Sequence, residues 1–306
     1  MGGMKQVEEH ARQQFGVVSR KQLVDARLAR SSIGWKVKTG ELERVNELVF
    51  RLRGAPPCWQ RSAMEGLLSC GPGSALSHKT AAWLHRLEGF ATPKIVDVSC
   101  QGARPRPIAG LAFHRRPRLS PPPVISDVWK ITAVQQTLVD LADELTDEAL
   151  EIALDSAQRR YKYASDWFDS YLSALKPRGT PGLSRLIELF NLRRGVVTDS
   201  PLEVKVLRRL REVGLVPTDI QFEVYERDGT YVMRLDFAWA TLKIGLHVDS
   251  YLWHQQRERF DRDAKQRSRL QVLGWRYVTV TSRNFEDGSW LADLRALLDP
   301  QRELPL

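Results

Sequence analysis

Residues 234–254, RLDFAWATLKIGLHVDSYLWH, alternate apolar and polar side chains, break at a turn, and then alternate again. This period of two predicts a pair of neighbouring β-strands, at residues 231–239 and 242–250. Two acids and two imidazoles interrupt the apolar positions: Asp236, His247, Asp249 and His254. Each is unremarkable alone, as a turn acid or an exposed histidine. Together they are expected to gather where the two strands end, which indicates a site.

Regular elements are predicted on both sides of these strands. Residues 200–215 have apolar side chains at helical spacing, and residues 220–226 predict a further strand that a turn joins to the first. A charged helix is expected at 255–273 and a closing strand at 276–282. The predicted order is therefore helix, three strands, helix, strand.

Carboxylates on neighbouring strand ends can form an oxygen cage for a hard divalent cation, Mg²⁺ or Mn²⁺, and such an ion can activate water and offset charge on a phosphate. Asp236, Asp249 and Glu203 are the predicted metal ligands. His247 and His254 are predicted to assist catalysis, His254 as a general acid or base or as a contact to a phosphate oxygen, because imidazole titrates near neutral pH.

The C-terminal third resembles the very-short-patch-repair-like endonucleases of the PD-(D/E)XK superfamily. The similarity covers residues 199–300 and is carried by an acidic helix, DF at 236–237, the acid at 249, WH at 253–254, FDRD at 260–263 and L-GWR-V at 273–278. It implies a restriction-endonuclease-like fold and metal-dependent cleavage of DNA.

The chain departs from this family at the third strand. The family's strand usually ends in Glu-x-Asp-Gly, whereas this chain has His247, Val248, Asp249 and Ser250. Imidazole is a poor ligand for Mg²⁺. No lysine occupies the catalytic lysine's usual place, although Lys243 is expected to point the same way as His247 on the same strand. Whether His247 retunes the site or disables it stays open at this point.

Cations on the helix predicted at 255–273, and aromatic residues near the predicted strands, are further candidates for contact with DNA. The helix at 255–273 interleaves six cations with three acids, so much of its surface is self-neutralised. Arg262 and Lys265 are predicted to hold the DNA backbone. Three aromatic residues are either core side chains, the commoner role, or wedges that stack against bases; they are Trp239, Tyr251 and Trp253.

Residues 1–56 predict three short helices closed by a β-hairpin. The helices are expected at 5–14, after an N-cap at Ser19, and after an N-cap at Ser31 or Ser32, with a stop at residues 39–40. Residues 41–54 alternate around a polar turn, as a hairpin does. This order predicts a winged helix-turn-helix.

In such a module the third helix enters the major groove and the hairpin contacts phosphates. The predicted base-facing residues are Ser32, Lys36 and Lys38, and the predicted backbone contacts are Arg44, Arg51 and Arg53. A total of 46 Lys and Arg against 37 Asp and Glu gives a net charge of +9, which favours a polyanionic partner. The alternative is that these cations form the solvated face of a small protein-binding domain.

Residues 57–198 predict a mixed α+β region without a recognisable ligand pattern. His78, His85 and His114 occur singly and are expected to be ordinary hydrogen-bonded side chains. The three cysteines of the chain lack CxxC spacing and are expected to be reduced thiols. A polar N-terminus and the lack of an apolar run of about 18 residues predict neither a signal peptide nor a membrane span, and hence a cytoplasmic protein.

A second resemblance covers roughly residues 5–90. FGVVSRKQLVDARLARSSIGWKVKTGELERVNELVFRL, at 15–52, followed by CGPGSALSHKTAAWLHRL, at 70–87, is similar to the N-terminal half of AbiEi-type antitoxins. A weaker similarity continues through ITAVQQTLVDLAD, at 131–143. The resemblance implies a winged-helix DNA-binding domain, which in some members represses its own promoter.

The sequence thus predicts a multidomain α/β protein. Its parts are a winged helix-turn-helix at 1–56, an AbiEi-like α+β region at 57–198, and a PD-(D/E)XK nuclease-like domain with a restriction-endonuclease-like core at 199–306. The leading hypothesis is a DNA-binding protein with a metal-dependent endonuclease domain. The alternative is a non-catalytic transcriptional regulator or antitoxin with a degenerate nuclease fold. Double-stranded DNA is the expected partner, and a cognate toxin or a second copy of the chain are further candidates.

Overall fold

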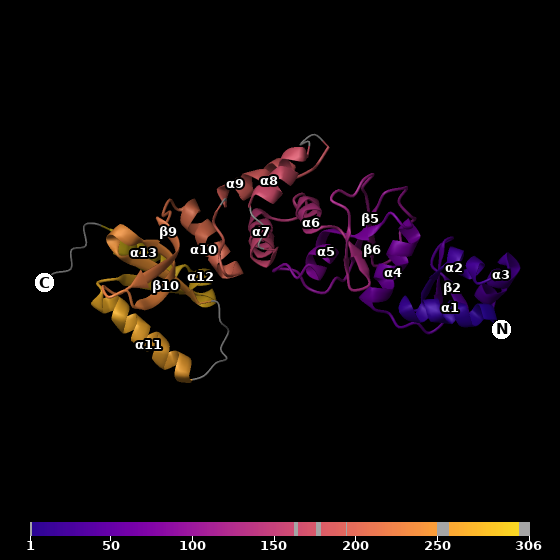
Figure 1. Cartoon of the computed structure of the whole chain (residues 1–306), viewed down its shortest axis with the longest axis horizontal. Coiled ribbons are helices and arrows are strands. Elements are labelled where there is room, and N and C mark those ends of the chain that lie inside the picture. Colours follow the sequence, from indigo (N-terminus) through magenta and orange to yellow (C-terminus); the bar gives the residue numbers. More distant parts are fainter. Residues whose placement is uncertain (1, 162–164, 176–178, 194, 250–256, 300–306) are drawn as a thin grey trace. The chain divides into compact units, whose positions relative to one another are not determined.

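The computed structural model describes residues 2–161, 165–175, 179–193, 195–249 and 257–299 (Figure 1). The chain divides into two compact units. The N-terminal unit comprises Met1–Ala157 and Tyr163–Phe190, and the C-terminal unit comprises Gln158–Lys162 and Asn191–Leu306. Three sheets and 13 helices lie within the described residues, so the prediction of a mixed α/β chain with more than one domain is confirmed. No helix among these residues combines the length and apolar character needed to cross a membrane.

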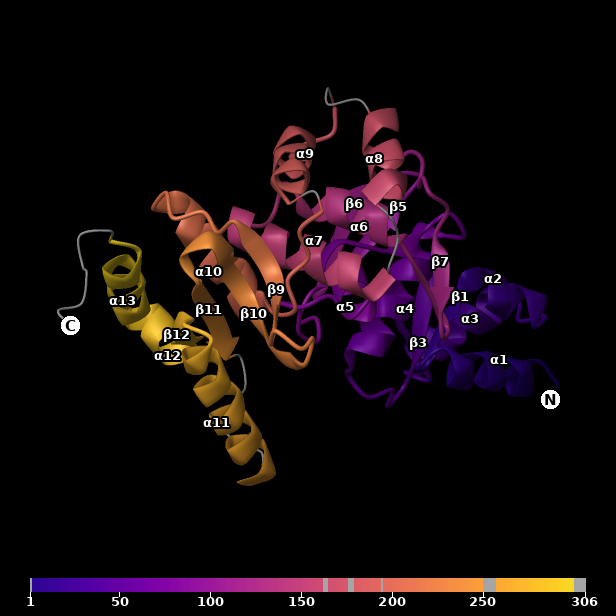
Figure 2. The same ribbon diagram turned by 60° about the vertical axis from the view of Figure 1, so that its left-hand side comes forward.

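The N-terminal unit begins with three helices and a small antiparallel sheet of order β1-β3-β2, which Figure 2 shows grouped together. The elements are α1 (Gly2–Gln13), β1 (Val17–Ser19), α2 (Arg20–Asp25), α3 (Arg30–Lys38), β2 (Leu42–Arg44) and β3 (Val49–Leu52). Val7, Leu23, Ile33 and Phe50 are fully or almost fully buried in their shared core. The predicted helices and hairpin are therefore present here.

The ends of these helices follow from their capping residues. Ser19 is the N-cap of α2, and it exchanges hydrogen bonds with Gln22 in a capping box, as predicted. The prediction of an N-cap at Ser31 or Ser32 for α3 is wrong. The N-cap is Ala29, whose backbone is already extended, so both serines fall within the first turn of the helix. Gly40, with a φ of +75°, follows the end of α3.

A second sheet of order β6-β5-β4-β8-β7 forms the middle of the N-terminal unit. Its strands are β4 (Ala75–Leu76), β5 (Val96–Cys100), β6 (Leu111–Arg115), β7 (Val124–Ser126) and β8 (Trp129–Ile131). The helices of this region are α4 (Trp59–Cys70), α5 (His78–Leu84), α6 (Val134–Leu141), α7 (Asp147–Tyr161), α8 (Ser165–Ala174) and α9 (Leu183–Leu192). The Pro-rich stretch at 116–133 contains β7 and β8.

One expectation about the cysteines is wrong. Cys70, the last residue of α4, and Cys100, the last residue of β5, form a disulfide with a Cα–Cα distance of 5.4 Å. The two residues are 30 positions apart, so their spacing in the sequence gave no sign of the pairing. The fold brings them together because α4 packs against β5. Cys58 is the free cysteine.

The C-terminal unit contains a four-stranded sheet of order β12-β11-β10-β9. Its elements are α10 (Pro201–Glu212), β9 (Asp219–Tyr225), β10 (Tyr231–Trp239), a 3₁₀ turn η1 (Ala240–Leu242), β11 (Ile244–Asp249), α11 (Arg257–Val272), β12 (Arg276–Thr281), α12 (Ser282–Asp287) and α13 (Ser289–Leu298). β11 and β12 are parallel, whereas β9, β10 and β11 are joined antiparallel. The predicted order of helices and strands is therefore present.

Two apolar clusters hold this sheet between helices. One joins α10 and α13 to the sheet, with Leu210, Phe237, Leu246 and Trp290 among its buried members. The other brings Leu270 of α11 against residues of β9 and β10. Trp239 is buried in the first cluster, and its indole N–H donates to the carbonyl of Val216 at 3.1 Å, so it is a core residue. Tyr251 and Trp253 lie outside the described residues.

The expectation that Lys243 continues the strand of His247 is wrong. β11 begins one residue later, and Lys243 ends the preceding 3₁₀ turn in the left-handed conformation, with a φ of +49°. Its ammonium group donates to the carbonyl of Leu273 at 2.9 Å. This contact lies at the start of β11, whereas Asp249 ends the strand.

Candidate functional site in the C-terminal unit

Asp236 lies where the ladder between β10 and β11 ends. The paired residues run from Trp239 opposite Ile244 to Phe237 opposite Leu246. Beyond that pair, the backbone N–H of Val248 donates to the Oδ2 atom of Asp236 at 2.6 Å. The carboxylate thus accepts a hydrogen bond from the backbone of the neighbouring strand, and Asp236 is 6% exposed.

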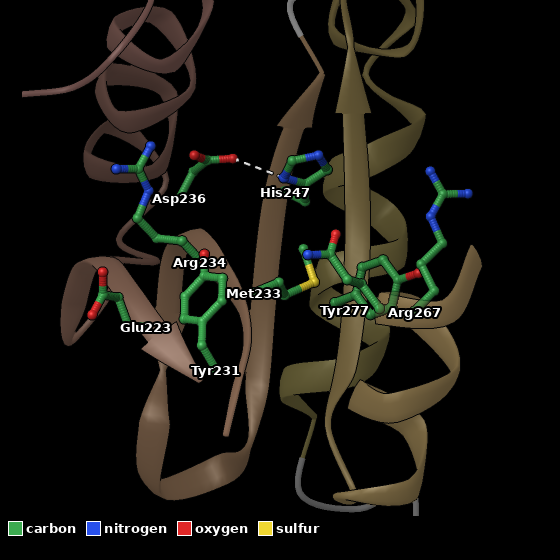
Figure 3. A pocket seen from close by; sticks show the side chains of 9 residues that line it. Glu223, Tyr231, Met233, Arg234, Asp236, His247, Arg267 and Tyr277 are labelled. Atoms are coloured by element: carbon green, nitrogen blue, oxygen red, sulfur yellow. Dashed lines mark ion pairs between the residues drawn. The ribbon is translucent and has the colours of Figure 1, made fainter. Parts of the chain in front are cut away.

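His247 faces the same carboxylate oxygen (Figure 3). Its Nδ1 atom is 3.2 Å from Oδ2 of Asp236, and the two side chains point toward each other from neighbouring strands. The contact with Asp236 raises the pKa of His247 above its ordinary value, against the opposing effect of burial, and the charge of Asp249 adds to the increase. The pair therefore favours an imidazolium ion beside a carboxylate.

A pocket of about 280 Å³ opens beside this ion pair. Its lining residues are Glu223, Tyr231, Met233, Arg234, Asp236, His247, Gln266, Arg267 and Tyr277. Figure 3 shows Arg234 on the side of Asp236 and Arg267 on the far side of His247. Arg234 forms an ion pair with Asp199. The two guanidinium groups and the imidazole of this pocket are the kinds of group that bind a phosphate, whereas its carboxylates oppose an anion.

Glu203 lies near Asp236, but its carboxylate accepts hydrogen bonds from residues at the start of α10 and from β9. Its Oε1 atom accepts from the hydroxyl of Ser200 at 2.8 Å, and its Oε2 atom accepts from the N–H of Asp199 and from Nε2 of Gln221, each at 2.8 Å. Burial raises the pKa of Glu203 to about 7, and the charge of Asp236 contributes to the increase. Both carboxylate oxygens therefore already have donors.

The predicted metal ligands do not fit an oxygen cage for Mg²⁺ in this arrangement. Among the described residues, ligand atoms from three side chains lie within 4.8 Å of one another only at a different place, in the N-terminal unit. Glu203 is occupied by three hydrogen bonds, and Oδ2 of Asp236 is shared between Val248 and His247. Asp249 is half-buried at the end of β11. The prediction for His254 falls on a residue outside the described ranges.

Gln221, Arg234 and Arg267 were not among the predicted site residues. Gln221 lies on β9 with a φ of +55°, and its buried Oε1 atom has no hydrogen-bond partner among the described residues. Arg234 is two positions before Asp236, so the alternation of β10 was a usable signal for it. Nothing in the sequence distinguished Gln221 or Arg267 from neighbouring surface residues.

The six predicted DNA contacts of the N-terminal unit divide into two groups. Four are exposed on α3 or at the hairpin: Ser32, Lys38, Arg44 and Arg53. The other two have acidic partners within the chain. Lys36 pairs with Glu41 at 2.6 Å, and Arg51 turns toward the buried Glu65, with a separation of 3.3 Å. The large side chain of Trp35 on α3 is 58% exposed, which the helical pattern did not single out.

The two cations predicted on α11 have different outcomes. Lys265 is exposed, as a contact to a DNA backbone requires. The side chain of Arg262 lies outside the described residues. Arg267, two positions after Lys265, lines the pocket beside His247. The C-terminal unit thus presents basic side chains of α11 at and near the candidate site.

Comparisons with known proteins identify similar sequences but assign the chain to no family. No protein-family model matches the chain. It is 26% identical over 260 residues to Uncharacterized protein MT2308 of Mycobacterium tuberculosis strain CDC 1551 / Oshkosh and to Uncharacterized protein Rv2248 of strain H37Rv, in each case across 83% of this chain and 90% of the relative. A solved structure, the RV2827C protein from Mycobacterium tuberculosis, is 16% identical and covers 73% of this chain and 88% of that one, with a TM-score of 0.28.

Proposed function

We propose that the chain is a DNA-binding protein whose N-terminal unit contacts the duplex through α3 and the β2–β3 hairpin. The observation that carries this proposal is the two-sided character of α3. Ile33 packs into the core, whereas Ser32, Trp35 and Lys38 are exposed. A short helix with one buried side and an exposed side of hydroxyl, aromatic and cationic groups is suited to the major groove.

The hairpin supports the same proposal. Arg44, at the end of β2, and Arg53, just after β3, are exposed cations at the hairpin that follows the three helices. Contacts to phosphates position a protein on DNA without reading its sequence. In this proposal, the helix therefore supplies sequence preference and the hairpin supplies affinity.

Binding to a labelled DNA duplex at several salt concentrations tests this function. The double variant Lys38→Ala/Arg53→Ala is expected to bind more weakly and with a smaller salt dependence than the unaltered chain. Lys36→Ala is the matched control, because Lys36 is already paired with Glu41. Equal affinity of the double variant and the control would exclude α3 and the hairpin as the DNA contact.

Metal-dependent cleavage of a phosphodiester by the C-terminal unit is a second candidate function. The favouring observation is that Asp236 and His247 meet at a pocket that two arginine side chains also line. In the arrangement described, however, His247 lies against Oδ2 of Asp236, the oxygen that also accepts the N–H of Val248. A metal ion on this oxygen requires that the ion pair open, and DNA binding without cleavage follows if Asp236 takes up no metal ion.

A plasmid-nicking assay with Mg²⁺ and with Mn²⁺ separates these two possibilities. Cleavage that is lost in Asp236→Asn supports an endonuclease. Equal background in the unaltered chain and in Asp236→Asn, together with retained DNA binding, supports a regulator. His247→Glu then restores the acid that the resembling nucleases carry at this position, and a gain of nicking would show that this one residue blocks the site.

A further inference from the structure

A second polar cluster lies in the N-terminal unit, outside the proposed DNA contact. His78 is the first residue of α5, His114 lies on β6, and Glu144 follows α6. Each supplies one ligand atom, and these three atoms lie within 4.8 Å of one another. His78 and His114 are 36 positions apart with no metal-site spacing between them, so the sequence pattern predicts two single, hydrogen-bonded histidines. The fold nevertheless brings the three side chains together.

The two imidazoles are unusually close. Their rings stack with a centroid separation of 3.6 Å and an angle of 18° between the planes. The Nε2 atom of His78 is 3.9 Å from Oε1 of Glu144, which is too long for a hydrogen bond. Two ligands of a tetrahedral zinc ion, each about 2.0–2.2 Å from the metal, lie about 3.3–3.5 Å apart. These two atoms would therefore have to approach by a few tenths of an ångström, and one ring would have to turn out of the stack so that the in-plane lone pairs of both imidazoles point at one ion.

In each imidazole, one ring nitrogen lies at hydrogen-bond distance from a neighbouring oxygen, as in metal-binding histidines. Asp97 lies beside His114, with 3.0 Å between Oδ1 and Nε2. A carboxylate that accepts the N–H of one ring nitrogen leaves the other nitrogen with a free lone pair, as in many metal sites. Asp97 is itself held by a hydrogen bond from its N–H to Oγ1 of Thr80 at 2.9 Å. The Nδ1 atom of His78 is 2.9 Å from Oγ of Ser77.

The charged groups around the cluster are negative on balance, which favours a cation. The facing acids are Asp97, Asp140 and Glu144, and the facing cations are Lys79 and Arg116. Arg116 and Gln136 both reach Oδ1 of Asp140. The other oxygen, Oδ2, is buried, has no hydrogen-bond partner among the described residues, and is 3.9 Å from Nδ1 of His78. The acids therefore exceed the cations by one charge.

His78 has a conformation that the surrounding structure must enforce. Its φ is +47°, which a residue with a side chain rarely adopts and which is found preferentially at functional sites. The residue is 5% exposed, so the groups around it fix the position of the ring.

We propose that His78, His114 and Glu144 bind one divalent transition-metal ion, of the class of Zn²⁺, in the N-terminal unit. Two imidazoles and one carboxylate suit zinc and its neighbours, whereas Mg²⁺ prefers oxygen ligands throughout. Asp97 orients His114, and Asp140 supplies negative charge beside His78. Glu144 and His114 are partly exposed, with 29% and 24% of their side chains accessible, which gives an ion a path to the site.

Titration of the full chain with Zn²⁺ after treatment with a chelator tests the proposal, with Co²⁺ absorption as a second readout of ligand type. One ion per chain is expected at this site. Glu144→Gln removes a partly exposed ligand and is expected to weaken binding at least about 10-fold, and Asp97→Asn by about 10- to 100-fold. Lys79→Ala removes the ammonium group 3.1 Å from Glu144 and is expected to tighten binding, a result that misfolding would not produce.

Two controls separate this site from others. His10→Ala removes a histidine on α1, and Asp236→Asn alters the acid that pairs with His247 in the C-terminal unit; both are expected to retain the ion with unchanged affinity. Circular dichroism checks that the variants are folded. The proposal is overturned if the unaltered chain binds no Zn²⁺ at micromolar concentrations, or if folded Glu144→Gln and His114→Gln bind it as tightly as the unaltered chain.

Discussion

The carboxylate of Asp236 accepts the backbone N–H of Val248 at 2.6 Å, so a side chain takes over the hydrogen bond at the point where the β10–β11 ladder ends. The acid that resembles a nuclease residue is thus also part of the sheet. Removing the side chain leaves a buried N–H without an acceptor, which costs about 1–3 kcal/mol. We expect Asp236→Ala to lower the free energy of unfolding by this amount, measured with urea, and Asp236→Asn, which keeps an acceptor, to lower it less.

The contact between Asp236 and His247 predicts a change in titration. The pKa of His247 is raised above 6.5. In Asp236→Asn, the negative partner is absent and burial opposes the charged ring, so the pKa is expected to fall. Proton NMR of the imidazole against pH measures this value in both chains. An unchanged midpoint in Asp236→Asn would contradict the ion pair.

The same contact predicts a pH dependence of stability. A raised pKa in the folded state means that the stabilising effect is complete below the unfolded pKa and is lost as the pH rises through the folded pKa. The unaltered chain is therefore expected to lose stability relative to Asp236→Asn as the pH rises above 6.5. Urea unfolding of both chains below and above pH 6.5 measures the difference in their free energies of unfolding.

The raised pKa of Glu203 predicts a second pH dependence of stability, between pH 4.5 and about 7. Its pKa is raised from 4.5 to about 7, chiefly by burial, so the folded state favours the protonated acid. The contribution of Glu203 to stability is expected to be largest below pH 4.5 and to be lost as the pH rises toward 7. Glu203→Gln should flatten this part of the stability profile. Glu212→Gln, at the partly exposed end of the same helix, should leave it unchanged.

Glu65 predicts a large loss of stability in the N-terminal unit. Its buried carboxylate lies 3.3 Å from Nε of Arg51 and 3.4 Å from Nε of Arg61. Without Glu65, Arg51 keeps Glu43 at 3.8 Å and Arg61 keeps the carbonyl of Ala55, but both partly buried guanidinium groups lose a partner, at a cost of about 1–3 kcal/mol. We expect Glu65→Ala to lower the free energy of unfolding by this amount. Glu9→Ala, which removes an exposed pair with Arg12, should change it by about 0–1 kcal/mol.

The order of elements could be predicted because most segments carry a clear hydrophobic period. Strands β9 to β12 and helix α10 follow that pattern closely, and Ser19 supplies a recognisable helix start. β7 and β8 have three residues each and lie in a stretch rich in proline, so no hydrophobic period indicates them. The N-cap of α3 is Ala29 rather than one of the expected serines. Ala29 makes no side-chain hydrogen bond to the helix, so no capping residue type in the sequence marks this start.

Of the candidate site, the sequence predicted Asp236 and His247 but neither their contact nor the two arginines that line the same pocket. The strand pattern placed Asp236 and His247 on neighbouring strands, yet nothing in it indicated that the imidazole would pair with the carboxylate. Lys36 and Arg51 carry the charge expected of DNA contacts, but tertiary neighbours turn them toward acids. The cluster of His78, His114 and Glu144 arises from three separate elements, so no local spacing could reveal it.

The position of Asp236 limits what the acid can say about function. An acceptor for the N–H of Val248 serves the sheet whether or not the C-terminal unit cleaves DNA. An acid at the end of the β10–β11 ladder is therefore no evidence of catalysis on its own; the behaviour of Asp236→Asn and His247→Glu with DNA decides that question.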